Sequence, residues 1–304
     1  MLKLILANNQ TERFVNFYEE LKTQSSVPFD YSGYNDLLFV FDTEASQTID
    51  VYNIASQKKL TDYDGVYING YLPAYEYAAT VAICCTALGV GFQNREMADA
   101  PSLSKLSAYA KLAANGVSIP KTIAGSKAAL LQAESLGLSA GFPAILKRAD
   151  ADRGIDNYKV KDYEEVKQLL NDHNESSIWV LQEFVPNDGY YLLTYYNGVP
   201  EYAIFRTLEK RPDGNEQKAH MYKPKGGVNA SLIDISEVNT TIVDECTRAI
   251  TVINRQIGSV DCIYDADKGR AYILEVNYNP QFVTIETFKE ARTEAFLNNL
   301  KHLQ

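Results

Sequence analysis

Apolar and polar residues in the first hundred positions follow two patterns in turn, one typical of buried strands and one typical of helices. Short apolar runs at residues 2–6, 37–41 and 65–69 predict strands that are buried on both faces. Residues 11–21 and 78–88 carry apolar side chains at helical spacing. Buried strands separated by helices indicate a small α/β layer with a parallel sheet.

A second region begins after residues 99–102, where the run Asp-Ala-Pro-Ser indicates a boundary. The pattern beyond it again alternates between helices and strands. It predicts helices at 104–114, 127–136 and 163–171, a short extended segment at 117–123, and strands at 142–147 and 178–184.

The remaining sequence is typical of an antiparallel sheet. Asn197-Gly198 separates two apolar runs, which is the strongest short-range signal for a β-hairpin. The pattern predicts strands at 191–196, 200–208, 258–264 and 270–277, helices at 238–253 and 285–300, and a long polar loop at 211–227.

These elements predict an α/β (α+β) chain of three domains. We place them at residues 1–100, 101–184 and 185–304, the last with a largely antiparallel sheet. A chain of 304 residues is long enough to bury a core in each.

The charge of the chain changes the range of possible partners. The formal net charge is −10, and no long run of Lys or Arg occurs. Sequence-independent binding to nucleic acid or to an anionic membrane needs a positive field, so neither partner is expected.

Localisation and redox state follow from the apolar stretches and the cysteines. The most apolar stretch, residues 78–92, is shorter than the roughly 18 residues that a membrane span needs. The apolar run at the N-terminus is too short for a signal peptide. The four cysteines, Cys84, Cys85, Cys246 and Cys262, show no CxxC spacing. We therefore expect a cytoplasmic protein with reduced thiols, and neither a zinc site nor a disulfide framework.

Three polar residues near the C-terminus are candidate metal ligands. Glu275 and Asn277 share one face of the predicted strand 270–277, and a turn near Lys268 would place Asp261 opposite Glu275. Two carboxylates paired across a sheet repel each other, and a hard cation such as Mg²⁺ would remove that cost. The alternative is a solvated outer face with incidental acids, but apolar residues flank all three positions.

Upstream residues could bind the phosphates and base of a nucleotide. Lys147 ends an apolar strand and would need an anionic partner if buried. Arg153 and Gly154 lie in the polar loop 150–156, which could cover phosphates. Residues 182–185, Gln-Glu-Phe-Val, end a strand before a proline and could present free backbone groups to adenine. Taken singly, an ordinary strand-end lysine and a plain strand terminus are the commoner interpretations.

Taken in order, these patterns resemble the ATP-grasp enzymes of the RimK-like carboxylate–amine ligase branch. The resemblance covers about residues 101–286 and depends on five segments in the expected order. These are Ser104-Lys105 through Pro120, residues 142–147 with Arg153-Gly154, residues 182–185, Arg206 with Lys225-Gly226-Gly227, and Asp261 with Glu275 through Pro280.

The resemblance implies a role for each candidate residue. The phosphates would be bound by Lys105, Lys147, Arg153 and Gly154, and the adenine by Gln182, Glu183, Phe184 and Val185. Many relatives carry Asp-Ile-Arg shortly after this hinge. The aligned run here is Gly189-Tyr190-Tyr191, so Asp188 is the candidate for the acid near ribose or phosphate. Arg206 and Lys225 would neutralise an acyl phosphate, and Asp261, Glu275 and Asn277 would hold two Mg²⁺ ions, or Mn²⁺ in their place.

The implied activity is ADP-forming ligation. ATP would phosphorylate a carboxylate, and an amine would then displace the phosphate, with residues 1–100 as the pre-ATP-grasp domain on the substrate side. The expected partners are small-molecule or peptide substrates, in a homodimer or homotetramer. Two alternatives stay open: a graspetide-type ligase that modifies a peptide, and an ATP-binding protein that has lost catalysis.

Overall fold

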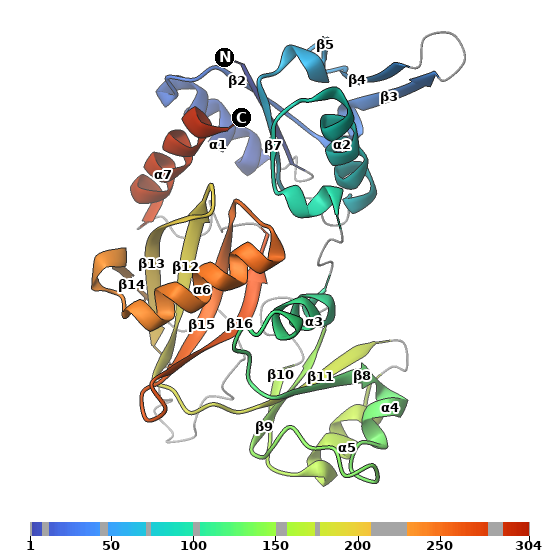
Figure 1. Cartoon of the computed structure of the whole chain (residues 1–304), viewed down its shortest axis with the longest axis vertical. Coiled ribbons are helices and arrows are strands. Elements are labelled where there is room, and N and C mark those ends of the chain that lie inside the picture. The colour runs from blue at the N-terminus through green and yellow to red at the C-terminus, as the bar shows by residue number, and fades with distance from the viewer. Residues whose placement is uncertain are drawn as a thin grey trace.

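The computed structural model describes residues 2–7, 12–42, 48–70, 74–99, 104–149, 157–173, 177–207, 230–278 and 288–303. These residues form four sheets, and both ends of the chain lie in the same part of the molecule (Figure 1). The confirmed fold class is a mixed α/β (α+β) chain whose largest sheet is antiparallel.

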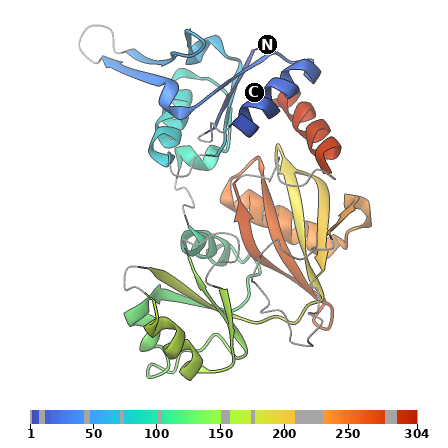
Figure 2. The same ribbon diagram turned by 180° about the vertical axis from the view of Figure 1, so that it is seen from behind.

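The N-terminal sheet is parallel, as predicted. Its strands lie in the order β2-β1-β6-β7, and helices α1 and α2 pack beside them (Figure 2). The elements are β1 (Lys3–Leu6), α1 (Glu12–Gln24), β2 (Phe29–Ser32), β6 (Gly65–Ile68), α2 (Tyr75–Leu88) and β7 (Phe92–Gln93).

The predicted strand at 37–41 exists, but its placement in the parallel sheet is wrong. It is β3 (Leu37–Asp42), which pairs antiparallel with β4 (Thr48–Asn53), and β5 (Lys58–Lys59) completes this separate sheet. An apolar run shows that a strand is favourable but does not specify which strand it pairs with. The side chains of Leu38 and Phe41 are 55% and 61% exposed, so this run is not buried on both faces.

The central sheet is antiparallel, in the order β10-β9-β11-β8. Its elements are α3 (Lys105–Ala114), β8 (Thr122–Ser126), α4 (Lys127–Leu131), β9 (Ala144–Arg148), β10 (Asn157–Val160), α5 (Tyr163–Asn171) and β11 (Ile178–Glu183). Helix α4 ends before residue 136, where the prediction had placed its end, and turns continue the chain to Gly137.

The C-terminal sheet holds five strands in the order β14-β13-β12-β15-β16. They are β12 (Gly189–Tyr196), β13 (Val199–Thr207), β14 (Ala230–Ile233), β15 (Gly258–Asp265) and β16 (Arg270–Asn277), with α6 (Thr240–Ile253) and α7 (Lys289–His302) as the helices. The predicted hairpin at Asn197-Gly198 is confirmed: both residues have a positive φ, and β12 and β13 pair on either side of them.

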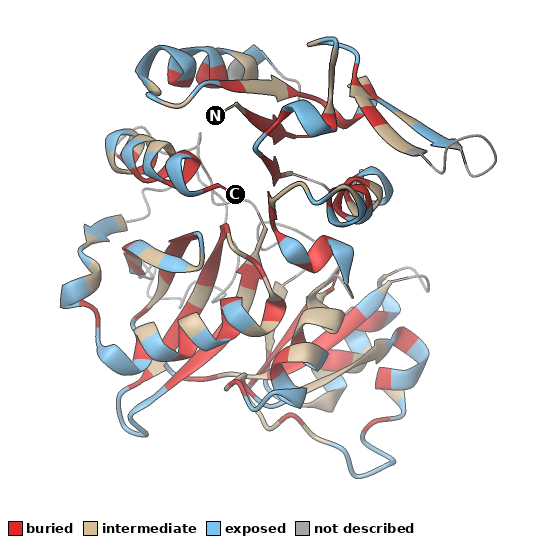
Figure 3. Cartoon of the chain, turned by 45° about the horizontal axis from the view of Figure 1, so that its top comes forward, coloured by how far each residue is buried: buried red, intermediate tan, exposed pale blue. Residues whose placement is uncertain are grey.

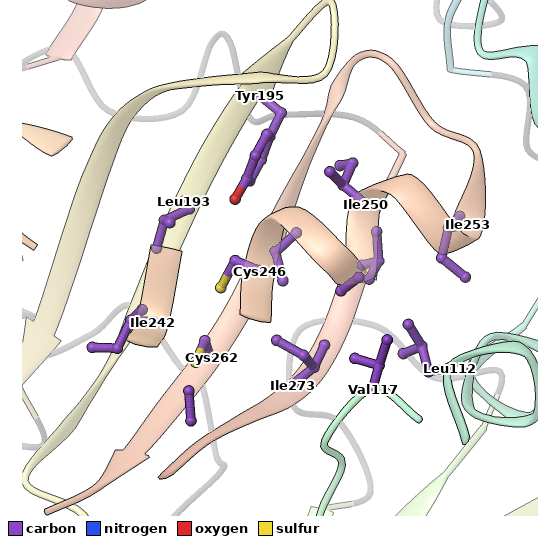
Figure 4. Close-up of a cluster of buried hydrophobic side chains, with 14 of the residues drawn as sticks. Leu112, Val117, Leu193, Tyr195, Ile242, Cys246, Ile250, Ile253, Cys262 and Ile273 are labelled. Carbon is purple, nitrogen blue, oxygen red and sulfur yellow. The ribbon is translucent and has the colours of Figure 1, made fainter. Parts of the chain in front are cut away.

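Helix α6 covers one face of this sheet and encloses the largest core. Side chains such as Ile250 and Cys246 of α6 meet Leu193, Cys262 and Ile273 of the strands (Figure 4). The inner side of α6 is buried and its outer side exposed, as Figure 3 shows. Because this face is filled, functional polar groups of the sheet must lie on the other face.

The first and last segments of the chain pack together. Lys3 of β1 donates a hydrogen bond to the carbonyl of Leu303, and Gln93 and Asn299 exchange two hydrogen bonds at 2.9 and 3.1 Å. Helix α7 therefore joins the N-terminal layer to the C-terminal sheet. The domain boundaries given above stay a prediction.

Two expectations about localisation and redox state can be compared with these elements. None of the helices in the described part of the chain is long and apolar enough to cross a membrane. Cys84, Cys85, Cys246 and Cys262 are buried and free.

Candidate active site

The face of the C-terminal sheet that α6 leaves uncovered carries the three candidate metal ligands. Asp261 of β15 is paired with Glu275 of β16, and Ser259 is paired with Asn277. The predicted pairing of Asp261 with Glu275 is thus confirmed. A β-bulge follows Asp261, and bulges commonly re-aim side chains next to active sites.

Asp261 is short of positive charge and of hydrogen-bond donors. Its Oδ1 atom is sealed from solvent and has no hydrogen-bond partner among the described residues, although Asn277 bonds to its side chain. Burial, and secondarily the charge of Glu275, raise the pKa of Asp261 to about 7. A buried acceptor with no donor is unfavourable, and a cation at this point would satisfy it.

Lys105 forms an ion pair with Glu275, the second carboxylate of the candidate site. Its Nζ lies 3.3 Å from Oε1 of Glu275, with the lysine side chain only 13% exposed. Lys105 is the first residue of α3, and its position is fixed by the N-cap Ser104, whose side chain accepts from the amide of Ser107. The site therefore brings Lys105, predicted to bind phosphate, next to the acids predicted to bind metal.

Lys147 reaches the same place from the central sheet. It is 7% exposed, and its Nζ donates to the hydroxyl of Tyr109 at 2.7 Å and to Oε1 of Gln182 at 2.9 Å. Burial lowers the pKa of Lys147 to about 8, although the charges of Glu275 and Asp261 act in the opposite direction. Lys147 is the buried strand lysine that the sequence pattern indicated. Glu275 and Asp261 are the anionic groups whose charges act on it.

Tyr109 is a site residue that the sequence reasoning missed. It is 4% exposed on α3, accepts from Lys147 and donates to the carbonyl of Leu274 at 2.7 Å, directly before Glu275. Burial, followed by the charge of Glu275, raises the pKa of this phenol. In the sequence Tyr109 is one residue on the apolar face of a predicted helix. The sequence pattern does not indicate that its hydroxyl connects Lys147 with β16.

Replacing Tyr109 with Phe should loosen the position of Lys147 while keeping the ring. Losing a hydrogen bond to a charged group costs about 1.5–3 kcal/mol, so we expect the KM for ATP to rise about tenfold or more. Steady-state kinetics measure this change. Tyr195→Phe is the matched control, because the Tyr195 hydroxyl bonds to Thr247 on the α6 side of the sheet. An equal effect in both variants would contradict the role of Tyr109.

Arg206 lies on the same face of the sheet, one strand beyond β12. It is 5% exposed, and its Nη1 donates to the hydroxyl of Tyr190 at 3.0 Å. The pairings Tyr190 with Arg206 and Leu192 with Asp261 place both candidate residues on one side of the sheet. Its proposed partner Lys225 lies outside the described residues, as do Arg153 and Gly154.

The predicted adenine hinge needs one correction. Gln182 is 2% exposed, and its Nε2 donates to Oγ1 of Thr122 at 2.9 Å while its Oε1 accepts from Lys147. The amides of Glu183 and Phe184 donate to the carbonyls of Lys121 and Pro143. The expectation of free backbone groups is therefore wrong for these two amides, because neighbouring segments of the central region take them up. Val185 is 1% exposed and packs against Ile263 and Tyr272.

Asp188 is exposed and directly precedes β12. The next residue has no room for a side chain: a Cβ at Gly189 would stand 2.8 Å from Cζ of Phe205. This close approach of β12 and β13 leaves no room for an acidic side chain at residue 189. Asp188 stays the candidate for that acid.

A second residue that the sequence reasoning missed is Arg255, in the loop between α6 and β15. It is 3% exposed, and its guanidinium lies 2.6 Å from Oε1 of the fully buried Glu96. Its Nη1 also donates to the carbonyl of Val276 at 2.7 Å, between the candidate ligands Glu275 and Asn277. Arg255 thus ties the backbone of the candidate metal strand to the N-terminal region. Its sequence context, Asn-Arg-Gln, gives no sign of this.

The candidate metal ligands have the chemistry of a magnesium site. No group of three His, Cys, Asp or Glu side chains gathers anywhere in the described ranges. The candidate set is instead two carboxylates and one amide, all oxygen donors of the kind that suit Mg²⁺, which keeps several waters and phosphate oxygens in its shell. The Oδ1 atom of Asp261, which has no hydrogen-bond partner among the described residues, is free to coordinate such an ion.

Comparisons with known proteins show the family of the chain and its fold. The family model of the RimK-like ATP-grasp domain matches residues 102–296. No curated protein sequence matches the chain.

Several solved structures share the fold. The ATP-grasp ligase PsnB complexed with minimal precursor, Mg and ADP has a TM-score of 0.66 at 13% identity, with 99% of this chain and 96% of that chain covered. D-alanine–D-alanine ligase from Bacillus anthracis has a TM-score of 0.64 at 15% identity, covering 100% and 97%. The macrocyclase MdnC bound with precursor peptide MdnA, from Microcystis aeruginosa MRC, has a TM-score of 0.62 at 10% identity, covering 98% and 100%.

The family match extends over more than half of the chain, from the segment before α3 to the middle of α7. It includes every residue of the site described above except Glu96. The chain therefore belongs to the RimK-like ATP-grasp family.

Proposed function

We propose that this ATP-grasp ligase activates a carboxylate with ATP and joins it to an amine, releasing ADP and phosphate. The observation that carries the proposal is the convergence of two lysines and two carboxylates from four elements, α3, β9, β15 and β16. Lys105 of α3 pairs with Glu275, and Lys147 of β9 lies within the electrostatic influence of Glu275 and Asp261. Phosphoryl transfer needs this combination of cations and metal ligands around the transferred group.

The residues of the site have complementary tasks. We propose that Lys105 and Lys147 bind the phosphates of ATP, and that Asp261, Glu275 and Asn277 hold two Mg²⁺ ions, or Mn²⁺ in their place. Bound there, the metal would neutralise the charge between the β- and γ-phosphates. Binding would exchange the Lys105–Glu275 pair for two stronger ones, lysine with phosphate and glutamate with metal.

Arg206 is the residue proposed to bind the acyl phosphate. Its guanidinium is buried on the same face of the sheet, and the Tyr190 hydroxyl bonded to it fixes its orientation. A fixed cation in this place would stabilise the charge of an acyl phosphate and keep its carbonyl polarised for attack by the amine. Asp188 and residues 182–185 are proposed to contact the nucleoside, and Lys225, Arg153 and Gly154 to complete the phosphate and acyl-phosphate contacts.

The raised pKa of Asp261 predicts a pH dependence that metal removes. The folded state holds this proton more tightly than the unfolded state. Between about pH 4 and about pH 7 the carboxyl ionises in the unfolded state before it does so in the folded state, so the free energy of unfolding falls as the pH rises. Without metal, the Tm of the wild type should therefore fall relative to that of Asp261→Asn as the pH rises through this window. Added Mg²⁺ at about pH 8 should raise the Tm of the wild type and not that of the variant.

Thermal unfolding at several pH values, with chelator or with Mg²⁺, measures these differences. Asp267→Asn is the control, because Asp267 is an exposed acid in the turn of the same hairpin. If Asp261→Asn and Asp267→Asn respond alike to pH and to Mg²⁺, Asp261 is not a metal ligand.

Two substrate classes fit this chemistry. The bacterial D-alanine–D-alanine ligase is named for a free amino acid, whereas PsnB and MdnC were solved with precursor peptides. A screen of amino acids and short acidic peptides for ADP release, with mass spectrometry of the products, separates these classes. AMP and pyrophosphate as products would contradict the proposed reaction. A homodimer or homotetramer stays a prediction, which light scattering after size-exclusion chromatography would test.

A further inference from the structure

The three-stranded sheet of the N-terminal region has two edges that differ in chemistry. Its strands lie in the order β3-β4-β5, so β5 forms one edge and β3 the other. Strand β5 consists of two lysines, whose side chains pair with Asp30 at 2.7 Å and with Asp50 at 3.0 Å. A short, charged strand is a usual means of keeping a sheet edge from pairing with another chain. The β5 edge is therefore protected.

The β3 edge lacks this protection. Residues 37–41, Leu-Leu-Phe-Val-Phe, contain no charge, proline or glycine, and they pair with β4 without a bulge. Within the described part of the chain, no strand pairs with the outer edge of β3. The hairpin of β3 and β4 also projects from the N-terminal layer (Figure 1 and Figure 2). An apolar edge strand in such a position is suited to pairing with another strand.

Strand β3 carries exposed apolar side chains on both faces of its sheet. Phe39 and Phe41 stack on the side that faces α2, where Phe39 also contacts Tyr77. Leu38 lies on the opposite side, because side chains alternate along a strand. Phe41 is 61% exposed and Leu38 is 55% exposed. A strand added at this edge would cover apolar surface on both faces at once.

The pairing of β3 with β4 shows which backbone groups of β3 remain open. The amide of Ile54 donates to the carbonyl of Asp36 at 2.8 Å, so the even-numbered positions of β3 bond to β4. The amides and carbonyls of the odd-numbered positions therefore point to the outer edge. One of these groups is already used, because the amide of Leu37 donates to the carbonyl of Tyr34.

We propose that the β3 edge binds the β3 edge of a second copy of this chain, as an antiparallel pair about a two-fold axis at Phe39. In this register Leu37 lies opposite Phe41 of the other copy, on the face toward α2. Leu38 lies opposite Val40 of the other copy, on the other face. Apolar side chains thus meet only apolar side chains on both faces.

The open backbone groups agree with this register. Phe39 of each copy would donate to and accept from Phe39 of the other copy. The amide of Phe41 would donate to the carbonyl of Leu37 of the other copy, which gives four hydrogen bonds across the axis. The amide that the turn before β3 already uses is the Leu37 amide, and the pairing does not require it.

The two neighbouring registers are opposed by charge. An axis at Val40 would place Leu38 opposite Asp42, and an axis at Leu38 would place Val40 opposite Asp36. Each of these registers sets a carboxylate against an apolar side chain, which the axis at Phe39 avoids.

The proposed assembly is a closed dimer. Both copies use the same edge, and the lysines of β5 protect the other edge, so no further copy is added. A single pair of edge strands is a small interface, so we expect a dissociation constant of about 1–10 µM. The candidate active-site residues lie outside this sheet, so the inference does not depend on the proposed function.

Sedimentation equilibrium of the wild type and three variants tests the interface, at concentrations on both sides of the expected dissociation constant. Leu38→Lys places a charge opposite Val40 of the other copy. Phe41→Pro removes an amide that points to the outer edge and keeps the hydrogen bonds between β3 and β4. Ile54→Lys is the matched control, because it makes the same change as Leu38→Lys at a residue that is 57% exposed and lies outside β3.

The wild type should approach twice the 34.0 kDa of one chain at the upper concentrations, and Ile54→Lys should do the same. We expect the dissociation constant to rise about tenfold or more in Leu38→Lys and in Phe41→Pro. The Tm of each variant, measured alongside, checks that it is folded. A wild-type tetramer that both β3 variants split into dimers would equally support the proposed pair.

A disulfide cross-link tests the register. Residues 38 and 40 of two copies would form a pair without hydrogen bonds, with about 4.5 Å between their Cα atoms, which a disulfide can bridge. Leu38→Cys and Val40→Cys, mixed in oxidised glutathione, should therefore form a covalent dimer. Neither variant alone should do so, because equal positions of the two copies would lie about 8 Å apart, beyond the reach of a disulfide.

Three results would overturn the inference. One is a wild type that stays monomeric at the upper concentrations. Another is an equal mass of Leu38→Lys and Ile54→Lys at every concentration, because the contact between copies would then lie elsewhere. The third is a covalent dimer that Leu38→Cys alone forms as readily as the mixture, which would contradict the axis at Phe39.

Discussion

Replacing both Glu275 and Asn277 with Ala should lower Mg-dependent ATP turnover about a thousandfold or more while the protein stays folded. Both residues point from β16 to the face that α6 leaves uncovered, and Asp261 alone would remain as an anionic ligand. Metal coordination of this kind supplies several kcal/mol of charge stabilisation in phosphoryl transfer, which corresponds to that factor. ADP release at saturating ATP, with Mg²⁺ varied, measures the loss.

The same hairpin offers a matched control. Asp267→Ala removes an exposed acid from the turn and should leave the turnover unchanged. Circular dichroism and Tm check that the double variant is folded. We expect it to fold, because Lys105, which loses its partner Glu275, keeps some access to solvent. Normal turnover in the folded double variant would place the metal elsewhere.

The largest effect on stability should come from Arg255→Ala. This change removes the ion-pair partner of the fully buried Glu96 carboxylate, and it also removes the donor to the carbonyl of Val276. Breaking a buried ion pair by removing one partner costs about 3–5 kcal/mol, so the free energy of unfolding should fall by that amount. Urea denaturation measures it, and the KM for Mg²⁺ should rise in any fraction that folds, because β16 loses its anchor.

Arg248→Ala is the control for this prediction. Arg248 lies on α6 and pairs with Glu245 at 2.8 Å; its own side chain is 52% exposed, and that of Glu245 is 11% exposed. Its Nη2 also donates to the carbonyl of Gly116 at 2.9 Å. Because this guanidinium lies half in solvent and Glu245 keeps the amide of Ser118 as a donor, the cost should be smaller than that of Arg255→Ala. Equal costs for Arg255→Ala and Arg248→Ala would show that the Glu96–Arg255 pair does not hold the N-terminal region against the metal strand.

Local patterns explain what could be predicted from the sequence. Asn197-Gly198 specifies its hairpin because both residues tolerate a positive φ. The turn at residues 266–269 specifies the second hairpin and pairs Asp265 with Arg270, so a regular ladder would place Asp261 opposite Leu274. The β-bulge after Asp261 shifts the register by one residue and places it opposite Glu275, as predicted. The two hairpins follow from residues that are close in sequence, whereas the sequence pattern does not reveal the bulge.

Long-range partners explain most of what was missed. Strand β2, with the sequence Phe-Asp-Tyr-Ser, has no continuous apolar run, yet it pairs with β1 in the parallel sheet. The roles of Tyr109 and Arg255 depend on contacts with Lys147 and Glu96, which lie far away in sequence.

The central claim is that the site transfers the γ-phosphoryl group of ATP to a carboxylate. It is tested most directly by trapping the activated carboxylate with hydroxylamine, which replaces the natural amine, in the presence of ATP, Mg²⁺ and acidic peptides. The account predicts a peptide hydroxamate, detected by mass spectrometry, formed in equal amount with ADP and lost in the Glu275→Ala, Asn277→Ala variant. Hydroxamate formed together with AMP, or formed equally by that variant, would contradict it.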